Sequence, residues 1–431
     1  MSAPSPGAWP SARDVVIGLL ASRPQSVPRG WLDADARRER LVAICRAHAV
    51  HLAVADCLRR EPDGNQPCVA RVIDTLEADK VLRGACLLGA DARLAAIHQA
   101  LAERDIPCCL LKGLALVHTI YKANPLSRCF GDIDILVPEQ HLDATLDVFQ
   151  GQGYRVAEHK RDIQALRHYN HKICFLAEGA VPNTVDVHFR PIGKKLYEQT
   201  ARLPTDAFFA GPHTVDIRGA RIRVPAPELH VLYLCVHLSL QHHLAALNWL
   251  YDLRIFAQRE PSLDWDDVVA RARDYRTCRA VAASLIAARS ILDAPVPPDA
   301  IARLLPSDPG PVTRVWMHSR MHVDNVISRK HDYRQRTLAG KFARMSSEVL
   351  LIDRAADRWR SVRRWVLPEP FLLRATYRVQ GRVPLFLCYV VHPFVLLAMG
   401  FSLVRLTLGY WIEACKRGQG PVFRGSTHGT G

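Results

Sequence analysis

Two aspartates, Asp132 and Asp134, lie one residue apart in the run DIDILV, which alternates and is rich in β-branched residues. This pattern predicts a β-strand, in which residues i and i+2 project from the same face. The two carboxylates should therefore lie side by side and repel each other, so that one takes up a proton or a cation binds. Because hard oxygen ligands suit Mg²⁺ or Mn²⁺, we expect a site for one of these ions.

A third carboxylate lies in the strand-like run TVDVHFR, where Asp186 stands between Val185 and Val187. If this strand is adjacent to DIDILV, three carboxylates converge at one end of the sheet. Three carboxylates can hold two metal ions, which stabilise the attacking and leaving oxygens of a phosphoryl displacement. His188 shares the face of Asp186 and is expected to line the same pocket.

A candidate phosphate site precedes the aspartates. Lys112 and Gly113 follow the apolar run IPCCLL, a predicted strand, and open the helical run GLALVHTIY. A glycine at such a turn lets backbone N–H groups approach an anion, and the helix that starts there points its positive end at it. Lys112 adds a point charge, and Arg128, four residues before Asp132, adds a fork of donors.

Each of these features alone is weak evidence of a site. A DxD pair also occurs in edge strands and in glycosyltransferases, where it carries the metal of a sugar nucleotide. The full order is more specific: strand, Lys-Gly turn, helix, arginine, DxD strand, helix and a later strand with one more aspartate. The sequence contains neither a P-loop GxxxxGK[ST] nor a GxGxxG that opens a helix, so these two nucleotide-binding motifs are excluded.

This order of motifs resembles the polymerase-β-like nucleotidyltransferase superfamily. More closely, the pattern LLKGLAL…Y…R…DIDILV…GY…VDVH resembles a bacterial family of uncharacterised nucleotidyltransferases, the NTP_transf_5 type, over residues 85–255. The resemblance implies transfer of NMP from an NTP to an acceptor, with release of pyrophosphate. It does not identify the acceptor, which we expect to be a small molecule, a glycan precursor or a peptide.

The resemblance also implies roles for individual residues. Asp132 and Asp134 would bind the metals, and Asp186, as third carboxylate, would assist deprotonation of the acceptor hydroxyl. The superfamily has Gly-Ser or Gly-Gly at the phosphate turn, so Lys112 would replace the contact that serine makes with the triphosphate. An NTP-binding module without turnover is the alternative, and the presence of all three aspartates argues against it.

The flanking sequence predicts helices around this core, from apolar positions three and four residues apart. We therefore expect an α+β fold in which a mixed sheet with helices is flanked by helical regions. The predicted regions are an N-terminal helical region at 1–105, the nucleotidyltransferase core at 106–224, an acceptor-side helical region at 225–312 and a basic, Arg-rich region at 313–431.

The acceptor-side region contains a histidine-rich helical run, CVHLSLQHHLAALNWLYDL. His237 is separated from His242 and His243 by five and six residues, which is poor spacing for a shared metal on an α-helix. A place in the core or in a polar pocket and an active-site role both remain open for His237. Asp252 is expected in capping or ion pairing, with a place in the acceptor pocket as the alternative.

The net charge of +15 is concentrated in the C-terminal region. Residues 313–431 contain 20 Lys/Arg and 7 Asp/Glu, and 17 of the 20 are arginines, which suit phosphate or lipid headgroups. A diffuse solvated surface is the alternative. Because the charge lies beside a hydrophobic segment and not in the α/β core, we do not expect nucleic acid as a partner.

Residues 383–404 contain no Asp, Glu, Lys or Arg over 22 residues, enough to span a bilayer of ~30 Å. Pro384, His392 and Pro393 interrupt the segment, and arginines flank it on both sides. Three alternatives are open: buried C-terminal helices, an interfacial membrane contact, or a span. We expect a cytoplasmic enzyme, with peripheral membrane contact through residues 370–412 as one alternative. A membrane-docked partner of a pathway is an alternative function for the chain.

The twelve cysteines include no CxxC pair, so that neither a zinc site nor a disulfide scaffold is expected. Buried thiols in a reducing compartment fit the pattern better. The first residues show no basic stretch followed by an apolar one, so we expect no secretory signal peptide.

Overall fold

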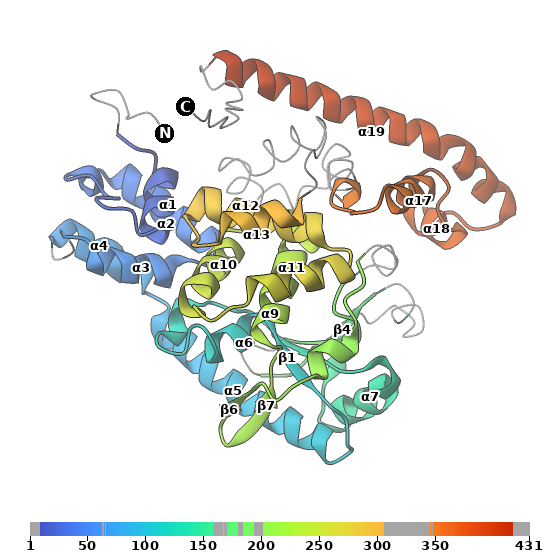
Figure 1. Ribbon diagram of the computed structural model, residues 1–431, viewed down its shortest axis with the longest axis horizontal. Coiled ribbons are helices and arrows are strands. Elements are labelled where there is room, and N and C mark those ends of the chain that lie inside the picture. Colours follow the sequence, from blue (N-terminus) through green and yellow to red (C-terminus); the bar gives the residue numbers. More distant parts are fainter. Residues whose placement is uncertain are drawn as a thin grey trace, which may run out of the picture.

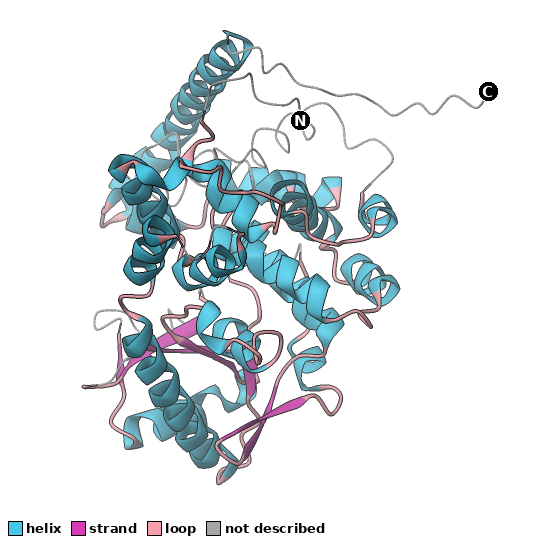
Figure 2. Ribbon diagram, turned by 90° about the vertical axis from the view of Figure 1, so that its left-hand side faces the viewer, coloured by secondary structure: helices cyan, strands magenta, loops and turns pink. Residues whose placement is uncertain are grey.

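A computed structural model of the protein contains a seven-stranded mixed sheet, which lies in the lower half of the views in Figures 1 and 2. The structure describes residues 9–416 except 63, 65, 158–166, 168–169, 180–183, 194–200, 306–344 and 346–347. The strands are β1 (Cys109–Leu111), β2 (Ile133–Leu136), β3 (Arg155–Val156), β4 (Lys172–Leu176), β5 (Thr184–His188), β6 (Thr214–Ile217) and β7 (Ala220–Arg223). Their order across the sheet is β3-β4-β5-β2-β1-β7-β6.

The middle of the sheet combines parallel and antiparallel pairs. Strand β2 is parallel to β5 and antiparallel to β1, whereas β1 is parallel to β7. The outer pairs β3–β4, β4–β5 and β6–β7 are antiparallel. All residues of β1 and β2 are buried, because helices cover both faces of the sheet.

The two faces of the sheet belong to two different hydrophobic clusters. Ile133 and Ile135 of β2 pack in one cluster with residues of α5 (Lys80–Ala102) and α7 (Leu142–Gly151). Leu136, on the other face, belongs to a larger cluster with the helices that precede and follow the sheet. Side chains alternate along a strand, so Asp134 faces the larger helical region together with Leu136.

The helical region on that face comes from the parts of the chain that precede and follow the sheet (Figure 1). The N-terminal helices are α1 (Ala12–Leu20), α2 (Asp35–Ala47), α3 (His51–Arg60) and α4 (Pro67–Leu76). The helices after the sheet are α9 (Pro227–Val236), α10 (Leu247–Arg259), α11 (Trp265–Asp274), α12 (Cys278–Leu292) and α13 (Pro298–Leu304). Helix α1 contacts α12, so the two groups form one helical layer.

A C-terminal group consists of α17 (Ala355–Val366), α18 (Pro370–Tyr377) and the long helix α19 (Arg382–Lys416). Figure 1 shows α19 on the side of the molecule away from the sheet. Pro393 lies inside α19, and the helix continues through it. The segment 383–404 is therefore helical, but only 11% of its most apolar window is buried, so it is not a core helix.

The predicted α+β class with flanking helices is confirmed. Strand β1 is shorter than the predicted run 106–111. The sequence also predicts a helix in RDIQALRHY, and these residues, 161–169, lie outside the described part of the chain apart from Arg167. The β6–β7 hairpin was not predicted as strands. The long helical run after Pro225 is interrupted by a π-helical turn, η6 (His237–Gln241), and a loop. The four region boundaries stay predictions.

Candidate active site

Asp134 and Asp186 lie opposite each other on neighbouring parallel strands, β2 and β5. Both carboxylates are buried, with 4% and 2% exposure, and His188 is fully buried two residues beyond Asp186. His188 Nε2 lies 2.8 Å from Asp134 Oδ1. One ligand atom from each of these three residues lies within 4.8 Å of the other two. The two aspartate-bearing strands are therefore adjacent, which the predicted convergence of the carboxylates requires.

Asp132 precedes β2 by one residue and is only partly buried. The charge of Asp134, followed by burial, raises the pKa of Asp132 to about 7. Burial alone would raise the pKa of Asp134 as well, but the charge of Lys112 and hydrogen bonds from His188 and Lys112 lower it far below its usual range. The two aspartates therefore behave as the repelling pair that the DxD spacing predicts.

Two lysines neutralise the buried carboxylates. Lys112 Nζ lies 2.5 Å from Asp134 Oδ1 and 3.3 Å from His188 Nε2. Lys172, at the start of β4, makes an ion pair with Asp186. Burial and the charge of Lys112 lower the pKa of His188 to about 4, so its imidazole is neutral near pH 7.

The donor set fits a divalent cation. Asp134 and Asp186 offer hard carboxylate oxygens and His188 offers a neutral imidazole nitrogen, and Asp132 lies two residues before Asp134. Oxygen donors suit Mg²⁺, and a mixed oxygen and nitrogen set also suits Mn²⁺. Asp134, Asp186 and His188 belong to paired strands, so the sheet fixes the positions of these donors, and Asp132 directly precedes β2.

Asp132 and Asp134 line a cavity of about 600 Å³ between the sheet and the helical layer, and its described lining does not include Asp186 or His188. Its charged lining consists of four cations and two carboxylates: Arg83, Lys112, Arg128, Lys172, Asp132 and Asp134. The rest of the described lining includes Gly113, Phe130, His171, Gly193, His237, Gln241, His242, Asn248 and Trp249. Four cations in one cavity are suited to a polyanion such as a triphosphate.

The Lys112-Gly113 turn lies directly beside the carboxylates. Helix α6 (Lys112–His118) begins at Lys112, one residue earlier than predicted, and Leu111 pairs with Asp134 across β1 and β2. Lys112 has a positive φ of 48°, so this turn is locally strained. A Cβ on Gly113 would lie 2.9 Å from Phe130 Cβ, which explains the glycine by close packing.

Arg128 lines the cavity, and its guanidinium forms an ion pair with Asp252. Arg128 Nε lies 2.7 Å from one carboxylate oxygen of Asp252 and 3.0 Å from the other. The Tyr121 hydroxyl donates to the same carboxylate at 3.0 Å. Burial would lower the pKa of Arg128, and the charge of Asp252 outweighs this and raises it. Of the two alternatives for Asp252, the structure shows the ion pair.

His237 and His242 form a wall of the cavity together with Trp249. Their Nε2 atoms lie 3.0 Å apart, and the His242 ring lies against the Trp249 ring with centroids 3.6 Å apart. The π-helical turn brings His237 and His242 together, because such a turn aligns residues five apart. Burial lowers the pKa of His242 to about 3 and that of His237 well below its usual value, so both are neutral.

Sequence reasoning missed several residues of this cavity. Lys172 and His171 precede Asp186 by 14 and 15 residues, and only the pairing of β4 with β5 brings Lys172 opposite His188. Gly193 is packed so closely that an added Cβ would lie 2.6 Å from the His171 ring. The alternation in HKICFLAE, residues 171–178, predicts a strand that contains Lys172, but it does not specify the register of that strand against its neighbour.

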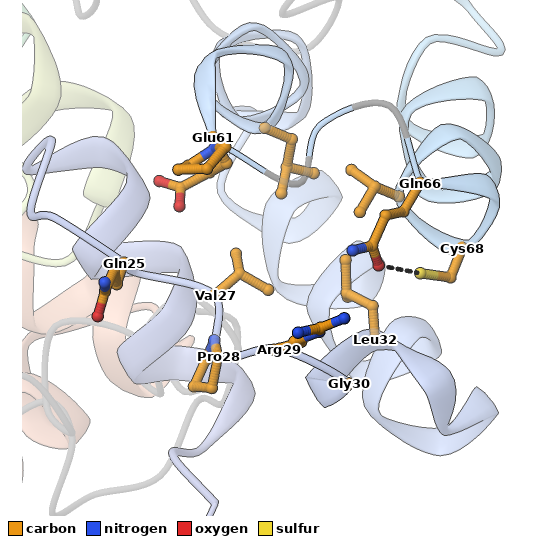
Figure 3. A pocket seen from close by; sticks show the side chains of 12 residues that line it. Gln25, Val27, Pro28, Arg29, Gly30, Leu32, Glu61, Gln66 and Cys68 are labelled. Atoms are coloured by element: carbon orange, nitrogen blue, oxygen red, sulfur yellow. Dashed lines mark hydrogen bonds between the residues drawn. The ribbon is translucent and has the colours of Figure 1, made fainter.

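A second pocket of about 380 Å³ lies among the N-terminal helices (Figure 3). Arg29 and Glu61 are its charged lining residues among those described, and Cys68 Sγ contacts Gln66 Oε1 at 3.8 Å. It contains none of the predicted site residues. We therefore place the active site in the cavity beside the sheet.

Comparison with known proteins identifies the family of the chain. No curated protein matches the chain. Among solved structures, the chain is similar to the antibiotic-resistance factor ANT(2'')-Ia, with 16% identity and a TM-score of 0.31 over 43% of this chain and 92% of that one. A family model described as uncharacterised nucleotidyltransferase matches residues 34–293, which is more than half of the chain and includes both aspartate-bearing strands. The chain therefore belongs to this family of uncharacterised nucleotidyltransferases and is an enzyme of the nucleotidyltransferase class.

Proposed function

We propose that the protein transfers NMP from an NTP to an acceptor hydroxyl, in a reaction that depends on Mg²⁺ or Mn²⁺ and releases pyrophosphate. The observation that carries the proposal is the register of β2 and β5, which puts Asp134, in the lining of a cavity with four cations, opposite Asp186. Two carboxylates this close together, next to a cavity lined by four cations, fit a metal–triphosphate complex better than they fit an anion alone or a metal ion alone.

Each residue has a role in this proposal. Asp132, Asp134 and Asp186 hold two divalent ions, which when bound neutralise charge on the reacting phosphoryl group. Lys112, the Gly113 turn and Arg128 bind the triphosphate, and the pairing of Arg128 with Asp252 fixes the orientation of its guanidinium. Asp186 accepts the proton of the acceptor hydroxyl.

The neutral wall of the cavity is the proposed place of the acceptor. His237, His242 and Trp249 present rings and neutral ring nitrogens there, and His188 lies buried behind Asp134. We propose a small molecule, a glycan precursor or a peptide as acceptor. We also propose that the enzyme works in the cytoplasm, with a peripheral membrane contact through residues 370–412.

The test uses purified protein with Mg²⁺ or Mn²⁺, each labelled NTP in turn, and fractions of a cell lysate as the source of acceptor. Label on a new product together with pyrophosphate release is the expected result, and Asp134→Ala should abolish both. NTP binding without turnover on any fraction would favour the alternative of a binding module. If no NTP binds and Asp134→Ala changes nothing, the proposal is wrong.

A further inference from the structure

Helix α19 presents a continuous apolar strip to solvent. Successive residues of an α-helix are ~100° apart, so eight large exposed side chains of α19 fall within an arc of about 140° and along about 27 Å. Their exposed fractions lie between 49% and 73%. The eight are Val383, Phe386, Leu387, Val390, Val391, Phe394, Leu397 and Phe401.

The opposite face of α19 is attached to the other C-terminal helices. His392 Nε2 donates to the carbonyl oxygen of Trp365 at 2.9 Å, which leaves Nδ1 to accept from the Tyr377 hydroxyl at 2.7 Å. The Tyr389 hydroxyl donates to the carbonyl oxygen of Pro368 at 2.8 Å. The strip is thus the outward face of a packed helical unit and not one side of a detached helix.

Exposed apolar surface is concentrated in this unit. Of the 16 large hydrophobic side chains that are exposed among the described residues, 12 lie between Trp359 and Phe401, and four of these 12 lie on α17, on α18 or between them. Such a concentration marks a site of interaction. Within residues 348–401, the exposed charged side chains are six arginines and one acid: Arg354, Arg360, Arg363, Arg374, Arg378, Arg382 and Glu369.

We propose that the C-terminal unit docks on the surface of an anionic bilayer, with α19 lying in the plane of the membrane and its apolar strip in the acyl region. An apolar face bordered by arginines is the composition of an interfacial helix, because the guanidinium groups pair with lipid phosphates. The proposal specifies the membrane contact proposed above, and it does not depend on NMP transfer.

The attached face of α19 argues against a spanning helix. To span, α19 would have to carry Tyr389 and His392 into the hydrocarbon and separate them from their partners on α17, on α18 and in the loop between them. The alternative of moving α17 with it would bury arginines in the bilayer, which is costly.

The positive charge of the C-terminal unit favours a lipid surface as its partner over a second copy of this chain. A symmetric dimer through the strip would bring two sets of exposed arginines together with few acids to pair with them. A bilayer with anionic headgroups supplies the complementary charge, and each arginine near its surface strengthens binding.

The test is sedimentation of the full chain with vesicles of phosphatidylcholine and phosphatidylglycerol at a ratio of 3:1, and with phosphatidylcholine alone. Wild type should bind the anionic vesicles, and the triple variant Phe386→Glu/Phe394→Glu/Leu397→Glu should bind at least about 100-fold more weakly. The matched control Leu82→Glu/Leu88→Glu changes two similarly exposed side chains on α5 and should bind like wild type. Arg374→Gln/Arg378→Gln/Arg382→Gln should weaken binding to anionic vesicles about 100-fold.

Circular dichroism and gel filtration establish that each variant is folded. Carbonate extraction should release wild type from the vesicles, and retention would overturn the in-plane arrangement. Equal binding by wild type and the triple glutamate variant would overturn the docking strip. A wild-type dimer that the triple variant converts to a monomer, without vesicle binding by either protein, would assign the strip to a second copy and overturn the proposal.

Discussion

The buried pair of Arg128 and Asp252 allows a quantitative prediction. The two residues are 7% and 1% exposed, and their closest atoms lie 2.7 Å apart. Removing one partner of a buried ion pair costs about 3–5 kcal/mol, because the other charge stays buried without compensation. Tyr121 still donates to Asp252 in Arg128→Met, so we expect a loss at the lower end, about 3 kcal/mol.

The double variant Arg128→Met/Asp252→Leu separates this interaction from the loss of a side chain. It removes both charges and leaves the hydroxyl of Tyr121 without its acceptor, at a cost of about 1–3 kcal/mol. The expected loss for the double variant is therefore no greater than for Arg128→Met alone. Asp252→Leu alone should cost about 3–5 kcal/mol, since it leaves Arg128 buried and unpaired.

Urea unfolding followed by circular dichroism measures the three variants against wild type, and calorimetry measures the NTP affinity of each folded variant. Losses that add up across the cycle would refute the reasoning, because independent sites are additive and a compensated pair is not. Unchanged stability of Arg128→Met with weaker NTP binding would show that the guanidinium serves the ligand alone. Lower stability with unchanged NTP affinity would show that Arg128 stabilises the wall of the cavity and does not bind the NTP.

Three further predictions concern the cavity. Lys112→Met removes the ammonium beside Asp134, so we expect NTP affinity to fall about 10- to 100-fold while Mn²⁺ binding persists, both measured by calorimetry. Asp132 has a raised pKa of about 7 in the folded protein, so its protonated form stabilises the fold at low pH and this contribution is lost as the pH rises through 7. Asp132→Asn should therefore make the metal-free protein more stable than wild type at pH 8 and equally stable near pH 4, measured by urea unfolding in EDTA. Gly113→Ala places a Cβ against Phe130 and should cost about 1–3 kcal/mol by the same method and lower NTP affinity.

Each of these variants has a control elsewhere on the chain. Lys122→Met and Asp147→Asn change exposed residues of the same types and should leave binding and pH dependence unchanged. Gly151→Ala adds a Cβ with no atom within 4 Å at a position outside the cavity and should be neutral. Equal effects of a variant and its control, or a stability gap for Asp132→Asn that is the same at pH 4 and pH 8, would contradict the corresponding prediction.

The convergence of Asp134 and Asp186 was predictable because it rests on local rules. Alternation along a strand fixes which side chains share a face. Burial of an unpaired carboxylate costs much free energy, so an aspartate in a buried strand indicates a partner or a bound cation. The order of elements then restricted which strands could be neighbours. The α+β class followed from the change between periods of 3.6 and 2 along the chain.

The remaining features depend on long-range structure or on local geometry that sequence patterns describe poorly. The contact of Lys172 with Asp186 requires the register between β4 and β5, which alternation leaves open. The spacing of five between His237 and His242 disfavours contact on an α-helix, and the π-helical turn reverses that conclusion. In the β6–β7 hairpin, Arg218 and Gly219 both have positive φ, and the Arg-Gly pair was the signal that we overlooked.

The most direct test of the central claim is calorimetric titration of wild type, Asp134→Asn and Asp186→Asn with non-hydrolysable α,β-methylene analogues of the four NTPs, with Mg²⁺ and with EDTA. The carboxylates of β2 and β5 should hold the metal of a metal–triphosphate complex. We therefore predict that at least one analogue binds wild type only with Mg²⁺ and that both variants lose this binding. Binding that is equal in EDTA, or equal in wild type and both variants, would contradict the account.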